Sequence, residues 1–344
     1  MNFASDNTAG VAPEIMAALG RANDGFTLGY GNDDTTRRVE QKFSALFERD
    51  VAVFLVPTGT GANALALAHV TPPWGAVLCH QNSHIAADEC GAPEFFGGGI
   101  KLVELPGDNG KLASQTLKTA LDKKASWGPP HHVTPAAVSI SQASEAGTIY
   151  RVSEIRALAD IAHAHGATLH MDGARFGNAL ARLNVSAADM TWKAGVDVLS
   201  FGATKGGAMG AEAVIFFDPK RAEGMSARRK RGGALLSKHR FIAAQMEAFL
   251  DGDLWLRLAR HANGMADRLG DGLTKAGYAP VWPVEANEVF AALPAALCDK
   301  LQAAGAMFYR WDADGSGNVI VRLVTSFQTT AEEVERFVAL AKAG

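Results

Sequence analysis

The sequence predicts an α/β fold, in which a mostly parallel sheet lies between helices and is followed by a smaller C-terminal unit of the α+β type. Two observations lead to this fold class. From residue 35 onward, short apolar runs alternate with segments of helical periodicity. After about residue 235 the alternation stops, and two long helical patterns precede the next apolar run. Regular alternation of strands and helices is typical of a parallel sheet.

The strands of this sheet are predicted by runs that are apolar at nearly every position. A strand covered by helices on both faces has no polar side, so its sequence does not alternate. Amphipathic segments such as "VSEIRALADIAHAHG" (152–166), which Gly166 closes, supply the covering helices. The predicted strands are 51–56 (VAVFLV), 76–80 (AVLCH), 136–140 (AAVSI), 167–172 (ATLHMD), 197–201 (DVLSF) and 213–217 (AVIFF).

The C-terminal part of the chain predicts a separate, smaller unit. Its elements are helices at about 237–250 and 253–276, a strand at 287–293 (NEVFAAL), a helix near 294–304, a strand at 318–324 (NVIVRLV) and a last helix from Thr330. We therefore expect a large domain over residues 1–235, with an N-terminal arm of residues 1–34, and a small domain over residues 236–344. The sequence has no repeat and no flexible linker, which favours close packing of the two domains.

Composition limits the classes of function. The 344 residues carry 33 Lys and Arg against 36 Asp and Glu, so no basic field would attract nucleic acid or an anionic membrane. Cys79, Cys90 and Cys298 form no CxxC pair, which predicts three free thiols in a reducing compartment. The start of the chain lacks a secretory pattern and no run of eighteen apolar residues occurs. We expect a cytoplasmic protein with a small-molecule ligand and no metal site.

One lysine stands in an unusual place, between two predicted buried strands. Lys205 follows Thr204 at the end of the 197–201 run and precedes "GGAMG". Burial of an ammonium group lowers its pKa and makes it a nucleophilic amine, as in a lysine that forms a Schiff base. By itself the lysine is also explained by a strand end that reaches solvent.

The motif "HMDGARFG" (170–177) places a carboxylate at another strand end. Asp172 needs a cationic partner if it is buried, and a protonated pyridine nitrogen would serve. A metal ligand or a helix cap would explain this aspartate equally well. Arg175 could bind a phenolate oxygen or a substrate carboxylate, or could form an ordinary surface ion pair.

Two further motifs point to an anion and to a flat ring. In "VPTGTGAN" (56–63) a strand leads through a Gly/Thr turn into a helix, so backbone N–H groups and the hydroxyls of Thr58 and Thr60 could bind an anion. The motif is neither GxGxxG nor a Walker A loop, which argues against a nucleotide. His84, at the start of a predicted helix, could stack on a cofactor and exchange protons. A capped turn and an ordinary polar histidine remain the alternatives.

Each of these features follows a predicted strand, and α/β folds bind ligands at strand ends. In chain order they are an anion cradle, a stacking group, a carboxylate for a ring nitrogen and an amine. This combination predicts pyridoxal 5′-phosphate (PLP) as the cofactor.

With these motifs in place, the sequence resembles the fold-type I PLP-dependent enzymes, in particular the low-specificity L-threonine aldolases and the related phenylserine aldolase of the beta-eliminating lyase superfamily. The motifs that carry the resemblance run in the family's order over nearly the whole chain: "FASDNTAG", "YGNDD", "PTGTGAN", "HIAADECGAPEFF", "LHMDGARF", "FGATKGG" and "VIVRLVT". The resemblance implies the fold-type I transferase fold, with a sheet of the seven-stranded type.

The resemblance also implies roles for individual residues. Lys205 becomes the Schiff-base lysine, Asp172 the partner of the ring nitrogen, and His84 the stacking residue and a candidate proton acceptor. The remaining implied residues are phosphate ligands Gly59 and Thr60, cofactor contacts Thr204 and Arg175, substrate-carboxylate ligands Ser5, Arg175 and Arg322, and Tyr30 at the rim of the site.

The resembling enzymes build their sites at a dimer interface, usually within a tetramer. The resemblance therefore implies a homodimer or homotetramer, in which Lys238 or the run "RRKR" (228–231) of a neighbouring copy reaches the phosphate. One departure affects substrate scope and the preference between threo and erythro forms. Where many relatives carry a histidine that faces the substrate hydroxyl, this chain has Ser144 and Glu145.

The implied activity is PLP-dependent retro-aldol cleavage of an L-3-hydroxy-amino acid (L-threonine, L-allo-threonine or L-phenylserine) to glycine and an aldehyde. Another PLP-dependent beta-eliminating lyase or an aminotransferase would need the same lysine and aspartate, and product identity separates them. A non-catalytic PLP-binding protein is the remaining alternative, although it would have no need of two arginines for a substrate carboxylate.

Overall fold

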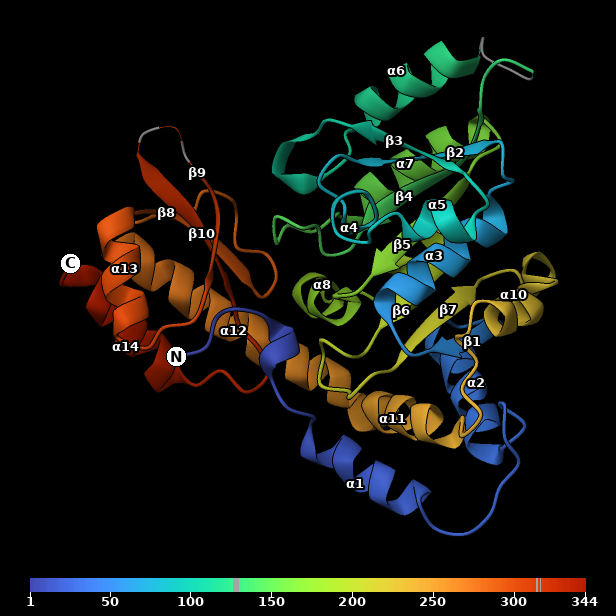
Figure 1. The fold of residues 1–344 in the computed structure, drawn as a ribbon, viewed down its shortest axis with the longest axis horizontal. Helices are drawn as coiled ribbons and strands as arrows, with labels where there is room; N and C mark the ends of the chain where they lie inside the picture. The colour runs from blue at the N-terminus through green and yellow to red at the C-terminus, as the bar shows by residue number, and fades with distance from the viewer. Residues whose placement is uncertain (126–129, 314, 316) are drawn as a thin grey trace.

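The computed structural model describes residues 1–125, 130–313, 315 and 317–344, and it contains a large and a small sheet (Figure 1). In the described part of the chain, the large sheet has seven strands in the order β1-β7-β6-β5-β4-β2-β3. They are β1 (Ala52–Val56), β2 (Gly75–His80), β3 (Lys101–Leu105), β4 (Thr134–Ser141), β5 (Thr168–Gly173), β6 (Val198–Gly202) and β7 (Glu212–Phe216). This mostly parallel sheet confirms the predicted fold class.

One strand of the large sheet runs against the others. β3, β2, β4, β5 and β6 pair in parallel, whereas β7 is antiparallel to both β6 and β1. Only residues 203–211 connect β6 to β7, and a parallel pair would need a crossover of about a dozen residues or more. The short connection therefore turns the chain straight back, and Lys205 lies within it.

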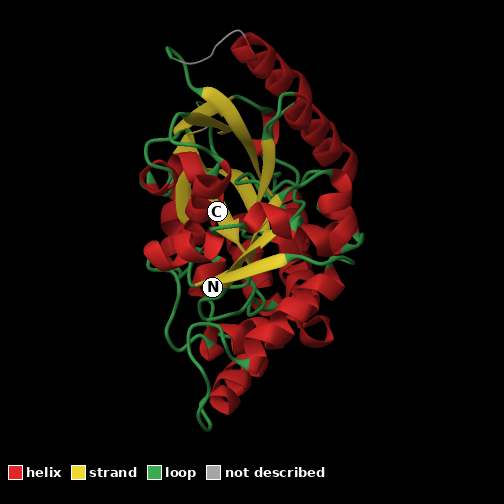
Figure 2. Cartoon of the chain, turned by 90° about the vertical axis from the view of Figure 1, so that its right-hand side faces the viewer, coloured by secondary structure: helices red, strands yellow, loops and turns green. Residues whose placement is uncertain are grey.

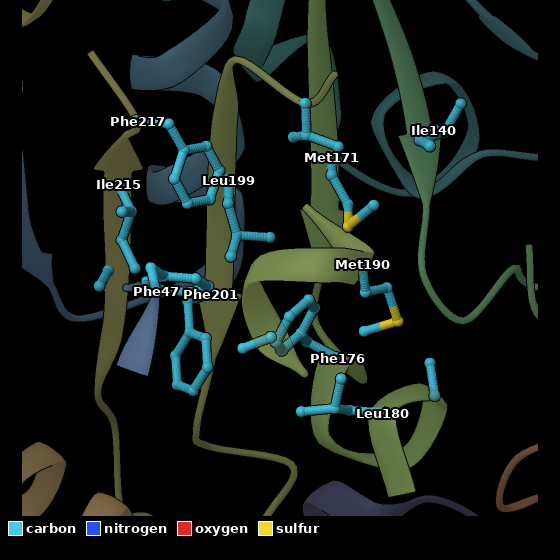
Figure 3. Close-up of a cluster of buried hydrophobic side chains, with 14 of the residues drawn as sticks. Phe47, Ile140, Met171, Phe176, Leu180, Met190, Leu199, Phe201, Ile215 and Phe217 are labelled. Atoms are coloured by element: carbon cyan, nitrogen blue, oxygen red, sulfur yellow. The ribbon is translucent and has the colours of Figure 1, made fainter. Parts of the chain in front are cut away.

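Helices cover both faces of the large sheet, and Figure 2 shows them flanking the strands. They are α1 (Pro13–Ala22), α2 (Asp34–Leu46), α3 (Gly59–Val70), α4 (His84–Ala87), α5 (Ala92–Phe96), α6 (Ser114–Ala125), α7 (Val152–Ala164), α8 (Phe176–Leu183), α9 (Ala187–Met190), α10 (Met225–Arg231) and α11 (Arg240–Leu250). Side chains of β6 alternate between the two faces. Val198 packs with α3, while Leu199 and Phe201 point into the larger core on the opposite face (Figure 3).

The smaller sheet is antiparallel, in the order β8-β10-β9. Its strands are β8 (Glu288–Pro294), β9 (Tyr309–Ala313) and β10 (Asn318–Val324), and its helices are α12 (Leu254–Lys275), α13 (Ala295–Ala303) and α14 (Ala331–Lys342). The N-terminal arm belongs to this core: Phe3 is fully buried and its ring centroid lies 5.2 Å from that of Phe337. Both ends of the described chain therefore contribute to the small unit.

The large and small units share α12, which runs from one to the other in Figure 1. Its first turn places Trp255 in the core of the large sheet, and its later turns place Leu269 and Leu273 in the small core. Helix α11 packs with the large sheet as well, through Ile242 and Met246. The domain boundary that the sequence predicts between residues 235 and 236 stays a prediction.

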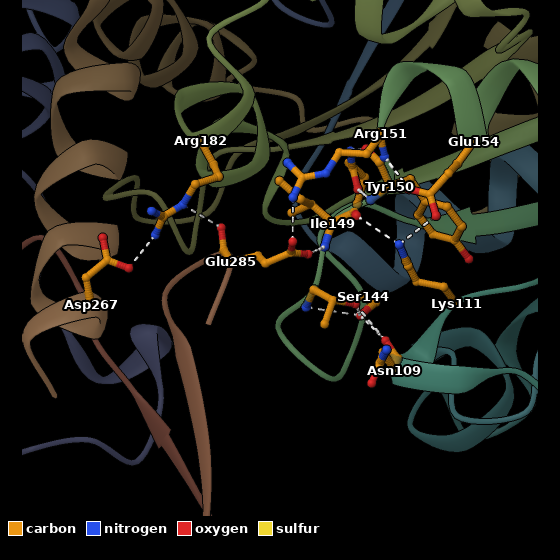
Figure 4. Close-up of polar contacts among 12 residues, drawn as sticks. Asn109, Lys111, Ser144, Ile149, Tyr150, Arg151, Glu154, Arg182, Asp267 and Glu285 are labelled. Atoms are coloured by element: carbon orange, nitrogen blue, oxygen red, sulfur yellow. Dashed lines mark hydrogen bonds and ion pairs between the residues drawn. The ribbon is translucent and has the colours of Figure 1, made fainter. Parts of the chain in front are cut away.

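A polar contact network also joins the two units (Figure 4). The carboxylate of Glu285 accepts hydrogen bonds from Ile149 N at 2.9 Å and from Arg151 Nη2 at 2.6 Å. Its backbone carbonyl accepts one from Arg182 Nε at 3.0 Å. These contacts hold the segment that precedes β8 against the carboxyl side of β4.

The six predicted strands of the large sheet are all present, but two strands were not predicted. β3 lies at the edge of the large sheet, with only its last residue buried, and every residue of β9 is exposed. Such edge strands carry polar side chains and lack a continuous apolar run, so the pattern that revealed the central strands is missing. Within the described ranges, no helix is both long and apolar enough to cross a bilayer.

Candidate active site

A cavity of about 450 Å³ lies where the large sheet, the N-terminal arm and the small sheet meet. Its wall contains five of the predicted site residues, namely Ser5, His84, Arg175, Lys205 and Arg322, together with Asn7, Asp88, Glu145, Tyr309, Arg310 and Trp311. These residues come from both ends of the chain and from the ends of separate strands. The fold thus brings together the amine, the imidazole and the two arginines that the sequence analysis singled out.

Lys205 is half-buried in the β6–β7 connection, and backbone contacts define the path of this loop. Thr204 Oγ1 accepts a hydrogen bond from Ala211 N at 3.2 Å, and Gly207 O accepts one from Ala12 N at 2.8 Å. Gly207 has φ +123°, a conformation that favours glycine. The loop therefore presents the lysine from a defined backbone, although Thr204 itself does not line the cavity.

Asp172 lies at the end of β5 and is buried, with 5% of its surface exposed. Its carboxylate accepts hydrogen bonds from Asn63 Nδ2 at 2.9 Å and Ala174 N at 3.0 Å. Both donors are neutral, and Asp172 forms no ion pair with any residue that the structure describes. A buried carboxylate without a cation is unfavourable. The site is thus suited to a ligand that brings a positive charge to Asp172.

His84 begins α4 and belongs to the same polar network. Its Nδ1 lies 2.9 Å from Glu89 Oε1, which also accepts a hydrogen bond from Asn63 Nδ2 at 2.8 Å. The hydrogen bond to Glu89 raises the pKa of His84 above its ordinary value, even though burial opposes this. The imidazole is therefore oriented, and its protonated form is favoured.

The N-terminus of α3 provides the predicted anion cradle. Thr58 caps the helix by accepting a hydrogen bond from Gly61 N at 3.0 Å. No atom lies within 4 Å of the position that a Cβ would take at Gly59, so a ligand could approach the backbone there. The free N–H groups and the helix dipole favour an anion at this end. Gly59 and Thr60 are half-exposed but do not line the 450 Å³ cavity.

Arg175 is buried and already paired with two carboxylates. Its Nε and Nη2 donate to Asp6 at 2.8 and 3.1 Å, and Nη2 lies 3.3 Å from Glu288 Oε1. Burial raises the pKa of Glu288 to about 7, although Arg175 opposes this shift. Arg175 thus lines the cavity as part of a charged cluster and is not the isolated surface ion pair that the sequence also allowed.

Arg322, on β10, retains an unused donor. Its guanidinium carbon lies 4.7 Å from the ring centroid of Trp311 and 5.5 Å from that of Tyr309, which restricts its orientation. Its Nε is buried and has no hydrogen-bond partner among the described residues. A buried, unpaired guanidinium donor at a cavity wall is suited to a carboxylate ligand.

Two more predicted site residues lie outside this cavity. Tyr30 is exposed, its N–H donates to Ser237 O at 3.0 Å, and Lys230 Nζ lies 4.6 Å from its ring centroid. Lys238 is exposed beside the same segment. Neither residue lines the cavity that contains Lys205 of its own chain.

The two residues that replace the family histidine, Ser144 and Glu145, lie in different surroundings. Ser144 is fully buried and structural: its Oγ lies 2.8 Å from Thr148 Oγ1 and donates to Asn109 O at 3.1 Å (Figure 4). Glu145, the next residue, lines the cavity with Lys205 and His84.

Sequence reasoning missed the carboxylates and the amide that support the site. They are Asp6, Asn63, Glu89, Glu212 and Glu288. A faint signal exists for two of them, because a glutamate within or next to an apolar run, as in "EAVIFF" and "NEVFAAL", is expected to be buried with a partner. Across the described residues, no three His, Cys, Asp or Glu side chains are grouped so as to hold a metal ion.

Comparison with known proteins finds similarity over nearly the whole chain. The model of the family described as "Beta-eliminating lyase" matches residues 2–296. The low specificity L-threonine aldolase of Pseudomonas aeruginosa is 42% identical over 333 residues, which cover 96% of this chain and 94% of that protein. A solved structure of Leishmania major threonine aldolase has a TM-score of 0.94 at 31% identity and covers 99% of this chain and 98% of its own. A solved structure of SPT with PLP is similar in fold, with a TM-score of 0.69 at 16% identity, covering 100% and 86%.

Proposed function

Because this chain belongs to the beta-eliminating lyase family, we propose that it is a PLP-dependent carbon–carbon lyase that cleaves L-threonine to glycine and an aldehyde. L-allo-threonine and L-phenylserine, which carry the same 3-hydroxy-amino acid group, are proposed as further substrates. The observation that carries the proposal is the shared cavity of Lys205, His84, Arg175 and Arg322. This set provides an amine for a carbonyl cofactor and a cation for an amino-acid carboxylate within one volume.

The donor set is consistent with PLP. Lys205 is the amine that would hold its aldehyde group, and Asp172 would accept a hydrogen bond from its ring nitrogen. Gly59 and Thr60, at the positive end of α3, would bind its phosphate, and His84 would stack on its ring. When bound, PLP withdraws electrons from the Cα of an attached amino acid.

The residues of this chain then decide which bond at Cα breaks. Arg322, with its unpaired Nε, would bind the substrate carboxylate, and Ser5 and Arg175 line the same cavity. Anchoring the carboxylate fixes the orientation of the other Cα substituents and favours cleavage of the Cα–Cβ bond. Arg175 is held by Asp6, so its guanidinium has a fixed orientation in the wall.

We propose that a second copy of the chain completes the site. Tyr30 and Lys238 lie side by side on the surface, away from the cavity of their own chain. In a homodimer or homotetramer these residues would serve the neighbouring copy, with Lys238 near the phosphate.

Product analysis of the purified holoprotein tests the proposed function. With L-threonine we expect equal amounts of glycine and acetaldehyde, and with L-phenylserine glycine and benzaldehyde. Borohydride treatment should fix the cofactor covalently to Lys205, and Lys205→Ala should remain unlabelled. A keto acid with ammonia would identify an eliminating lyase, an aminated co-substrate would identify an aminotransferase, and an absence of products would leave only a PLP-binding protein.

A further inference from the structure

Glu145 is a carboxylate in the active-site wall that the proposed function leaves without a role. It lines the cavity together with Lys205, His84 and Arg322. The chain reaches this position through the loop that follows β4, so Glu145 enters the cavity from the large-sheet side, whereas Arg322 enters it from the small sheet. A substrate held by its carboxylate at Arg322 would therefore have Glu145 in the wall of the same cavity.

The loop that carries Glu145 is held on both sides. Ser144 N donates to Thr148 O at 2.8 Å, and Ser144 Oγ accepts from Ala146 N and Thr148 N, both at 3.3 Å. Thr148 Oγ1 donates to Asn109 O at 2.6 Å, as Ser144 Oγ also does (Figure 4). These contacts surround residue 145 and use only its neighbours. The backbone of Glu145 is therefore positioned, while its carboxylate is left available.

The carboxylate of Glu145 has no partner in the part of the chain that the structure describes, whereas each of the following buried carboxylates around the site has one. Asp6 is bound by Arg175, Glu89 by His84 and Asn63, and Asp172 by Asn63 and a backbone N–H group. Glu145 is half-buried and makes no hydrogen bond or ion pair with any residue in the described ranges. Asp88 is the other acidic residue of the cavity wall, but it is exposed to solvent.

We propose that Glu145 accepts the proton of the substrate's β-hydroxyl group when the Cα–Cβ bond breaks. The proposal rests on the proposed function and names the proton acceptor within it. His84 is less suited to this step because its Nδ1 is bound to Glu89 and its protonated form is favoured, so its part is to stack and to hold its proton. A free carboxylate in a partly desolvated cavity can take the proton directly.

The step is balanced within the substrate, the cofactor and the protein. The O–H bond of the β-hydroxyl breaks and its proton passes to a carboxylate oxygen of Glu145. The electron pair of that bond forms the C=O bond of the aldehyde as the Cα–Cβ bond breaks. The electron pair of the Cα–Cβ bond stays on Cα, which the bound cofactor stabilises, and a proton delivered to Cα completes glycine. Glu145 then releases its proton to solvent, which balances the proton taken up at Cα, so no oxidant or reductant is needed.

The test separates loss of the proton acceptor from general damage to the site. Glu145→Gln should lower kcat/KM for L-threonine by about 10²- to 10⁴-fold, the usual contribution of a positioned acid or base. The same variant should still bind glycine and should still exchange the α-hydrogen of glycine with solvent. These two readouts need the cofactor, Lys205 and Arg322 but involve no β-hydroxyl group. Glu145→Asp should recover part of the lost cleavage.

Glu104→Gln is the matched control, since it removes one negative charge from an exposed position on β3, outside the cavity wall, and should change kcat/KM by less than about threefold. Cleavage by Glu145→Gln within threefold of the wild type would overturn the proposal. Parallel loss of cleavage, glycine binding and exchange would also overturn it, because Glu145 would then be structural. A wild-type enzyme that binds glycine but does not cleave L-threonine would instead contradict the proposed function.

Discussion

Arg175 and Asp6 form a buried bidentate ion pair, with Nε–Oδ2 and Nη2–Oδ1 distances of 2.8 and 3.1 Å between residues that are 169 positions apart. Asn287 Nδ2 also donates to Asp6 Oδ2, at 3.0 Å. This relationship joins the N-terminal arm, the end of β5 and the start of β8 at the cavity wall. It also explains how Arg175 can be buried, since its charge is compensated before any ligand binds.

The first prediction concerns this pair. Asp6→Asn leaves the buried Arg175 with less compensating charge, and we expect a loss of about 3 kcal/mol in the free energy of unfolding. Urea denaturation of the purified protein measures it. Glu14→Gln, which breaks the exposed pair between Glu14 and Arg257, should cost less than about 1 kcal/mol. Equal losses for the two variants would show that Asp6 does not stabilise Arg175 in this way.

The second prediction concerns Arg322. Arg322→Leu removes the unpaired buried donor, and we expect KM for L-threonine to rise roughly 10- to 100-fold, as loss of a hydrogen bond to a charged group implies. Steady-state kinetics measures the change. Arg310→Leu serves as control: Arg310 lines the same cavity but is engaged by Asp299 and Gln302, so KM should change little. An unchanged KM in Arg322→Leu would assign carboxylate binding elsewhere.

The third prediction concerns Asp172. Asp172→Asn keeps the shape of the side chain but removes the charge that would face the cofactor's ring nitrogen. We expect kcat for L-threonine to fall roughly 10²- to 10³-fold at saturating PLP, the kinetic equivalent of losing one partner of a buried ion pair. The absorbance of the bound cofactor is recorded in parallel, so that cofactor loss is distinguished from slow chemistry. A variant that retains full kcat would remove Asp172 from the proposed site.

The fourth prediction concerns pH and Glu212. Burial raises the pKa of Glu212 to about 7, against the opposing effects of Thr204 and Lys205. The folded protein therefore binds a proton that the unfolded chain releases between pH 4.5 and 7. The stability contributed by this group is present below pH 4.5 and is lost as pH rises toward 7, by about 3 kcal/mol in all.

Glu212→Gln should remove this pH-dependent loss in the free energy of unfolding. The stability of the variant relative to the wild type should rise between pH 5 and pH 8, as urea denaturation at a series of pH values would measure. A constant difference across that range would contradict the assigned pKa shift.

The fifth prediction concerns the three free thiols. Cys90 is exposed, whereas Cys79 and Cys298 are buried, and burial raises the pKa of Cys79 to about 11. The thiolate is the reactive form, so a thiol reagent at pH 8 should modify Cys90 rapidly and the other two only after unfolding. Cys90→Ser should abolish the fast phase. A fast phase that persists in this variant would contradict the assignment.

The elements that the sequence predicted are those that local pattern specifies. A strand that is apolar at nearly every position is stable only between two layers of helices, which is why the sequence predicted β2, β5, β6 and β7. The Gly/Thr turn before α3 and the lysine after β6 also follow from neighbouring residues. The sequence alone was therefore sufficient for six of the seven strands that the described residues form in the large sheet, and for placing Lys205, Asp172 and His84 beside strand ends.

Only the tertiary structure decided how the charges of the site are paired and which remain free. Arg175 contacts Asp6 and Glu288, His84 contacts Glu89, and Glu145 is left with an open carboxylate, although the local sequence marks only Glu288 among these acids as buried. The physical reason is that a buried charge needs a partner within a few ångströms, and the fold, not the spacing along the chain, determines which residues come that close.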